Sequence, residues 1–144
     1  MKNGYAYVKR VWQRGDVLTL TLPMPVERIT ARPDVRQDCG KVALKRGPVV
    51  YCIEEVDNGK HLNNRALRSN AAFTVKPGTK GILKGIPVIT TTAIVPDASA
   101  WKPGELYRAQ TTQPKSRPCK LTAIPYYLWC NRTPGEMQVW MNLD

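Results

Sequence analysis

Cysteine and histidine are the residue types in this chain that are best suited to hold a metal ion. The 144 residues contain four cysteines, Cys39, Cys52, Cys119 and Cys130, and a single histidine, His61. A zinc site needs ligands at short, paired spacings, such as Cys-x-x-Cys or two neighbouring histidines. Neither spacing occurs here, so we expect no metal site and no cofactor. His61 lies in a polar turn and is expected to be an ordinary surface residue.

The candidate nucleophiles and acids also lack the arrangements that catalysis requires. Cys52 lies in an apolar segment, which favours a small buried thiol over a nucleophile, because a reactive cysteine needs a nearby base to lower its pKa. Glycoside hydrolysis needs two carboxylates that face each other across about 5–10 Å. The adjacent pair Glu54 and Glu55 would point to opposite faces of a strand. We therefore predict no catalytic residue in this chain.

The aromatic residues are better candidates for binding, because a flat ring can stack on the apolar C–H face of a sugar. Tyr5 and Tyr7 are expected to share one strand face, as are Tyr127 and Trp129. A β-sheet core also uses aromatic residues at this spacing, and we favour core packing for both pairs. Trp101 lies in a proline-rich loop and is the aromatic residue most expected to be exposed. Trp101, Tyr127 and Trp129 are thus the predicted carbohydrate contacts.

The elements that must position these residues are short strands, because apolar residues recur with a period of two along most of the chain. Turn residues separate the runs, and no helical pattern exceeds about two turns. Four prolines make residues 96–118 a surface loop. The predicted strands are 5–12 and 17–22, which form a hairpin, then 26–31, 41–46, 49–54, 73–75, 87–95, and a closing hairpin of 119–129 with 137–141.

These segments predict an all-β fold with little helix, organised as a β-sandwich or jelly roll of antiparallel sheets. The strand 49–54 is almost continuously apolar, which predicts a central strand buried on both faces. We expect one module over residues 1–144. The alternative left open is that residues 1–55 include strands of a preceding sandwich in a longer parent protein.

Charge and hydropathy exclude several classes of protein. The formal net charge of +11 is shared almost evenly between the two halves and includes no long basic run, so a solvated basic surface is favoured over nucleic-acid binding. No apolar stretch approaches the ~20 residues of a membrane span. The first ten residues lack the apolar region of a secretory signal, so we expect a cytoplasmic protein with reduced thiols.

Two stretches resemble the C-terminal region of bacterial β-L-arabinofuranosidases of glycoside hydrolase family 127, formerly a domain of unknown function. The first stretch lies in the opening fifty-odd residues and the second in the last two dozen. The matching residues are Gly4-Tyr5, Trp12, Gly15-Asp16, Leu22-Pro23-Met24-Pro25, Gly40-Lys41-Val42-Ala43-Leu44 and Arg46-Gly47-Pro48-Val49-Val50-Tyr51-Cys52, then Leu121-Thr122-Ala123-Ile124-Pro125-Tyr126-Tyr127, Trp129, Asn131-Arg132, Pro134-Gly135-Glu136-Met137 and Val139-Trp140.

The resemblance implies a non-catalytic accessory domain. Enzymes of this family carry an (α/α)₆-barrel catalytic domain followed by β-sandwich domains, and their catalytic and zinc-binding residues lie in the barrel. No such residue is carried over to this chain. The implied partner is a barrel domain or subunit, while a homo-oligomer and a bound carbohydrate stay open. The alternatives from other classes are a stand-alone carbohydrate-binding module and, more weakly, a basic domain that binds polyanions.

Overall fold

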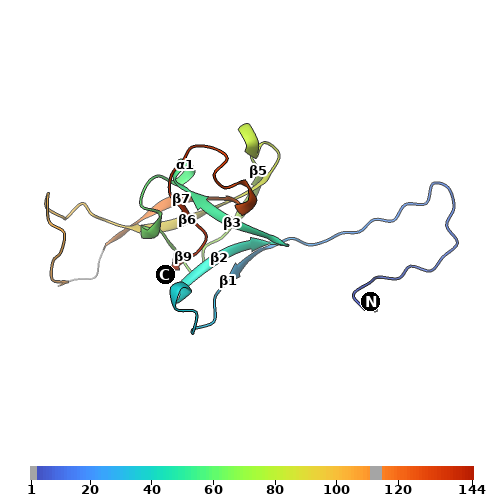
Figure 1. The fold of residues 1–144 in the computed structure, drawn as a ribbon, viewed down its shortest axis with the longest axis horizontal. Helices are drawn as coiled ribbons and strands as arrows, with labels where there is room; N and C mark the ends of the chain where they lie inside the picture. Colours follow the sequence, from blue (N-terminus) through green and yellow to red (C-terminus); the bar gives the residue numbers. More distant parts are fainter. Residues whose placement is uncertain (1–2, 111–114) are drawn as a thin grey trace.

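The chain is built almost entirely of β-strands. The computed structural model describes residues 3–110 and 115–144, and Figure 1 shows the strands gathered into one body. The all-β class with little helix is confirmed. The strands are β1 Val26–Ile29, β2 Lys41–Arg46, β3 Val49–Glu54, β4 Ala66–Leu67, β5 Thr74–Pro77, β6 Pro87–Pro96, β7 Ser116–Pro125, β8 Met137–Gln138 and β9 Met141–Leu143; the helical turns are α1 Glu55–Asn58, η1 Arg36–Asp38, η2 Leu62–Asn64, η3 Gly81–Leu83 and η4 Tyr126–Leu128.

The strands form one sheet that closes on itself, where the sequence predicted two stacked sheets. The ring runs β2-β9-β4-β6-β7-β3 and returns to β2. Every pairing in it is antiparallel except β4 with β9. The ring closes because β2 pairs with β9 through Lys41 and Val42 and with β3 through Leu44 to Arg46. A closed sheet leaves fewer backbone groups unpaired than two open ones.

The core fills the interior of this barrel. Ile89, Thr91 and Ala93 alternate inward along β6, and Leu121 and Ala123 do so along β7. The prediction that 49–54 is buried on both faces holds for Tyr51 to Glu54, which are all buried, but not for Val50, which is exposed. Two apolar clusters lie around β3, one containing Tyr51 and Ile53 with Leu44, Leu67, Leu121 and Met141, and the other containing Cys52 with Val88 and Ile124.

The predicted N-terminal hairpin is wrong for this structure, since residues 3–25 form no strand. Residues 3–25, here called the N-terminal arm, extend away from the barrel and double back (Figure 1). The turn between the predicted strands does form, with Asp16 N–H donating to the Gln13 carbonyl at 3.1 Å. A two-stranded hairpin without a third strand or a face to pack on is at best marginal in water, so the turn alone remains.

The predicted closing hairpin is also wrong. The strand β7 ends at Pro125, and the next residues form the turn η4. The strand β8 pairs with β3, whereas β9 pairs with β2 and β4. The predicted 96–118 loop is shorter in the structure, because Pro96 ends β6 and Ser116 to Pro118 begin β7. Residues 111–114 of the segment between these strands lie outside the described part. Among the described residues, no helix has the length and apolar character needed to cross a membrane.

Candidate functional site

Three carboxylates, Glu54, Glu55 and Asp57, lie where β3 ends and α1 begins, and Arg132 binds two of them. Its guanidinium pairs with Glu54 and donates to Asp57 Oδ1 at 2.9 Å. Only 4% of Glu54 is exposed, and its second oxygen accepts the Cys130 N–H at 3.0 Å. The hydrogen bond to Asp57, followed by that to Glu54, raises the pKa of Arg132. These charges are therefore paired with each other.

The other two acids of this region, Glu55 and Glu136, hold backbone groups. Glu136 accepts the N–H of Leu62 at 2.7 Å and that of His61 at 3.0 Å, and these bonds hold its pKa below the ordinary value. Glu55 in turn accepts the N–H of Glu136 at 3.0 Å. A general acid of a glycosidase needs a raised pKa, the opposite of what Glu136 has. The acids at the end of β3, on α1 and at Glu136 therefore bind an arginine or backbone N–H groups and stabilise the fold.

The structure separates the three predicted sugar contacts. Trp101 lies in the segment between β6 and β7, at the end of the molecule opposite the N-terminal arm (Figure 1). It is 39% exposed, and the Arg108 guanidinium lies over its ring at 3.9 Å from the centroid. That contact occupies one of the two ring faces on which a sugar would stack.

Tyr127 and Trp129 are both exposed but do not lie on one strand face. Tyr127 belongs to η4, and Trp129 stacks on Tyr126 with 5.9 Å between ring centroids and 20° between planes. The stacked pair follows an i, i+3 spacing because the chain turns after Pro125. Core packing is not observed for this group, nor for Tyr5 and Tyr7, which are exposed in the N-terminal arm. The sequence analysis missed Tyr126, and the proline before it was the available signal.

Tyr126 also borders a shallow apolar groove. Its volume is about 590 Å³. The lining is mostly apolar, with lysine and carboxamide groups at its margin. The residues are Gln37, Asp38, Lys41, Val50, Tyr126, Met137, Gln138, Val139 and Trp140. Tyr126 therefore belongs both to this groove and to the stack with Trp129.

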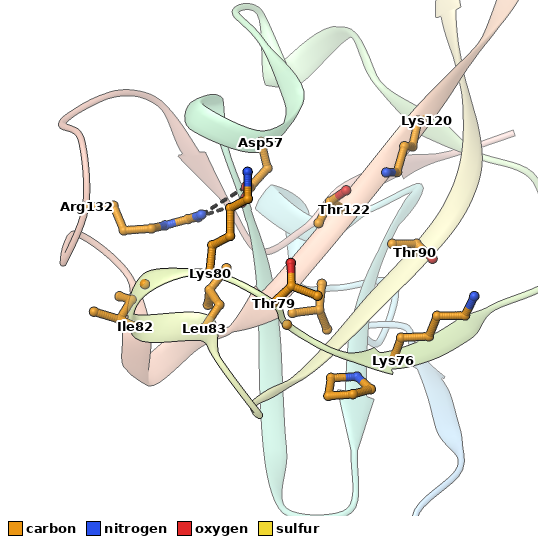
Figure 2. Close-up of a pocket in the computed structure, with 14 residues that line it drawn as sticks. Asp57, Lys76, Thr79, Lys80, Ile82, Leu83, Thr90, Lys120, Thr122 and Arg132 are labelled. Carbon is orange, nitrogen blue, oxygen red and sulfur yellow. Dashed lines mark hydrogen bonds and ion pairs between the residues drawn. The ribbon is translucent and has the colours of Figure 1, made fainter.

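A second pocket, of about 670 Å³, lies on β5 to β7 and is basic. Figure 2 shows Lys76, Lys80 and Lys120 around it, with threonine hydroxyls between them. Arg132 borders the same pocket, but its charge is directed to Asp57. None of Trp101, Tyr127 and Trp129 lines this pocket. Lysines and hydroxyls suit an anionic or hydroxyl-rich ligand, although no acid–base pair accompanies them.

Cys52, the thiol considered as a nucleophile, is 1% exposed in the core. Burial raises its pKa to about 12, so the reactive thiolate is not formed near neutral pH. Among residues 3–110 and 115–144, no three cysteine, histidine or acidic side chains are grouped as metal ligands.

Comparison with known proteins shows the family to which this chain belongs. The family model for the "Glycoside hydrolase family 127 C-terminal domain" matches residues 26–142. A non-reducing end β-L-arabinofuranosidase of Bifidobacterium longum is 34% identical over 143 residues, which are 96% of this chain and 21% of the relative. The crystal structure of a family 127 β-L-arabinofuranosidase from Geobacillus stearothermophilus T6 is 51% identical and superposes with a TM-score of 0.88. It covers all of this chain, which spans 22% of that enzyme.

A further solved family 127 β-arabinofuranosidase is 33% identical, with a TM-score of 0.67 over 84% of this chain and 17% of its own length. The chain therefore spans about a fifth of the relatives that it matches. It belongs to glycoside hydrolase family 127 and corresponds to the C-terminal domain of that family.

Proposed function

We propose that this chain is the non-catalytic C-terminal accessory domain of a β-L-arabinofuranosidase-like glycoside hydrolase, and that it supports a separate (α/α)₆-barrel catalytic domain. The observation that carries the proposal is the match of residues 26–142 to the C-terminal domain of the family. The matched enzymes are almost five times as long as this chain, which leaves ample length for a catalytic domain elsewhere in them.

The positions of the family motifs support an accessory role. Arg132 and Glu136 belong to the closing motif, and each bonds to the segment around α1 and η2. Between them, Gly135 lies so close to Glu55 that an added Cβ would be 3.0 Å from that side chain. The polar residues of the motif thus join the end of the chain to the end of β3, and Arg132 and Glu136 are both engaged in these contacts.

Hydrolysis by the isolated chain tests the proposal. We expect the purified chain to release no more arabinose from an aryl β-L-arabinofuranoside than the same chain after heat denaturation, with the Bifidobacterium enzyme as the positive control. Glu55→Gln is the matched variant, because Glu55 is the acid of the α1 region that is not paired with Arg132. The proposal would be overturned if the native chain released arabinose and the Glu55→Gln variant did not.

A carbohydrate-binding module is the second candidate, and the exposed Tyr126–Trp129 stack beside the apolar groove is the observation that favours it. In this case arabinofuranosides would shift the backbone amide NMR signals of Tyr126 and Val139, and Trp129→Ala would abolish those shifts. Tyr107→Ala is the control, because Tyr107 is 90% exposed and lies in the distant 97–110 segment. Unchanged spectra at millimolar sugar would exclude this function.

A further inference from the structure

Three lysines share the pocket on β5 to β7. Lys76 comes from β5, Lys80 from the loop between β5 and β6, and Lys120 from β7. Within the part of the chain that the structure describes, none of the three takes part in an ion pair. Asp57, the carboxylate of the pocket lining, already pairs with Arg132. A pocket lined by charges of one sign attracts ions of the opposite sign, so this one favours an anion.

Threonine hydroxyls lie between the lysines. Thr90 of β6 is the register partner of Thr122 of β7, and both point out of the barrel because the residue before each is buried in the core. The Thr90 hydroxyl donates only a long bond of 3.5 Å, to the Thr74 carbonyl. Thr79 adds a further hydroxyl from the loop. Such hydroxyls can donate to an oxyanion or exchange hydrogen bonds with a polyol.

Apolar side chains complete the pocket. Val88 precedes Thr90 by two residues on β6 and therefore shares its face. Leu83 packs against the cluster that contains Val88, and Ile82 lies beside it in η3. The pocket thus combines positive charge, hydroxyl groups and an apolar patch. These are the groups that would contact the anionic, hydroxyl and C–H parts of a small sugar derivative.

The loop that carries Thr79 and Lys80 is held by its own hydrogen bonds. The Gly78 N–H donates to the Ile86 carbonyl at 2.8 Å, and the Gly85 N–H donates to the Gly78 carbonyl at 2.9 Å. The Lys80 carbonyl accepts the N–H at the end of η3 at 3.2 Å. A loop that is already ordered loses little conformational freedom when a ligand binds, which favours binding.

We propose that this basic pocket binds a small hydroxylated anion of the class of sugar phosphates and sugar acids. The oxyanion lies among the lysines, and the hydroxyl and C–H groups contact the threonines and Val88. Lys80 and Lys120 lie on opposite sides of the pocket, with Thr79 and Thr122 between them (Figure 2). The volume of about 670 Å³ suits a monosaccharide rather than a polymer. The proposal does not depend on the proposed function.

An NMR titration of the isolated chain tests the proposal. Glucose 6-phosphate and glucuronate represent the phosphate and the carboxylate source, and glucose is the neutral control. At an ionic strength of about 20 mM, where screening is weak, we expect saturable shifts of the amide signals of Thr79, Lys80, Thr90 and Thr122. Glucose should bind at least about tenfold more weakly than the better anion, because it makes no charge-assisted hydrogen bond. The anion that binds more tightly identifies the source.

Two double variants with the same change in net charge separate the pocket from the overall charge. Lys80→Met combined with Lys120→Met should weaken binding at least about tenfold, because it removes two of the pocket charges. Lys9→Met combined with Lys102→Met removes two exposed lysines outside the pocket lining and should change the affinity by less than about twofold. Thermal unfolding of both proteins checks that they are folded, and the titration of the unmodified chain needs neither variant.

Three results would overturn the proposal. The first is the absence of saturable shifts at the pocket amides with either anion at up to about 10 mM. The second is equal weakening by the two double variants, which would assign the binding to net charge, as for a polyanion. The third is an affinity for inorganic phosphate or glucose equal to that for the better anion. Each of these results leaves the proposed function intact, because that function is tested by hydrolysis.

Discussion

Arg132 pairs with two carboxylates from 75 and 78 residues earlier in the chain, Asp57 on α1 and Glu54 at the end of β3. A lone buried carboxylate is costly because it loses its hydration without gaining a counter-charge. Glu54 is buried, so the arginine is what makes its position stable. At the scale of residues, the pairing of charges therefore explains the position of Arg132 in the family motif.

Removing the arginine while leaving the buried acid should strongly destabilise the domain. We expect Arg132→Met to lower the free energy of unfolding by about 3 kcal/mol, near the lower end for broken buried pairs, because 18% of the Arg132 side chain is exposed. Urea denaturation measures the change. Arg68→Met is the control at an exposed arginine and should change the stability by less than about 0.5 kcal/mol.

A double variant separates the ion pair from side-chain packing. If the cost of Arg132→Met comes from the unpaired Glu54, then adding Glu54→Gln should recover part of it, giving a coupling free energy well above the error. Additive effects of the two substitutions would contradict the explanation.

Glu136 should make stability depend on pH. Its pKa is held below the ordinary value of 4.5 by the N–H groups of Leu62 and His61, so its contribution is complete above about pH 4.5 and is lost as the pH falls through the lowered pKa. We expect Glu136→Gln to be less stable than the wild type at pH 7, with the difference shrinking between pH 4.5 and 3.

Thermal unfolding from pH 7 to 3 measures this difference. Asp97, whose pKa is lowered chiefly by the Ser99 N–H, titrates in the same range in both proteins and so cancels in the comparison. A difference that does not shrink as the pH falls below 4.5 to the acid limit of the native protein would rule out the carboxylate of Glu136 as the group responsible.

At the scale of elements, the loop from β5 to β6 depends on one close backbone approach. A Cβ on Gly78 would lie 2.2 Å from the Leu83 carbonyl oxygen, and backbone cannot move aside as a side chain can. We expect Gly78→Ala to cost about 2 kcal/mol and to distort the basic pocket that this loop borders.

Gly81→Ala in the same loop is the matched control for that substitution. Its Cβ would meet nothing within 4 Å, but its φ of +52° is unfavourable for alanine, so we expect a cost of about 1 kcal/mol. Both changes are measured by urea denaturation. An equal or larger cost at Gly81 would contradict the role assigned to the Gly78–Leu83 contact.

The bounds of a strand could be predicted where the local sequence alone determines them. The predicted strands 41–46 and 49–54 coincide with β2 and β3, because the Gly47-Pro48 turn and the apolar runs define them locally. Pairing partners were not predictable. The strand β9 pairs in parallel with β4, which is about 75 residues away, and nothing local encodes that contact. The N-terminal hairpin failed for a related reason, since a two-stranded hairpin needs a further strand or a face to pack on, and its own residues do not supply one.

At the scale of the whole molecule, the candidate site was only partly predictable. The exposure of Trp101 followed from its proline-rich surroundings. The Tyr126–Trp129 stack required the turn after Pro125, and the basic pocket required strands β5, β6 and β7 to lie side by side. Each of these surfaces is built by tertiary contacts, whereas the family resemblance could be read from short local motifs.

The domain exposes more apolar surface than a protein that functions alone usually does. The barrel has its own core, yet the N-terminal arm and the apolar groove present uncovered aromatic and aliphatic side chains. The chain spans 22% of the Geobacillus enzyme, so most of the surface available to cover them belongs to the rest of such a protein. The central claim is that this chain contributes stability and contact surface to a larger enzyme and no catalytic group.

The most direct test of that claim uses a graft, in which this chain replaces the matching C-terminal part of the Geobacillus enzyme. The activity of this graft is measured. We expect the graft to hydrolyse an aryl β-L-arabinofuranoside with a kcat/KM within about tenfold of the parent, a loss of no more than about 1.4 kcal/mol in transition-state stabilisation. The same enzyme without its C-terminal part should be inactive or insoluble, and the isolated chain should be inactive. Hydrolysis by the isolated chain, or full activity of the truncated enzyme, would contradict the claim.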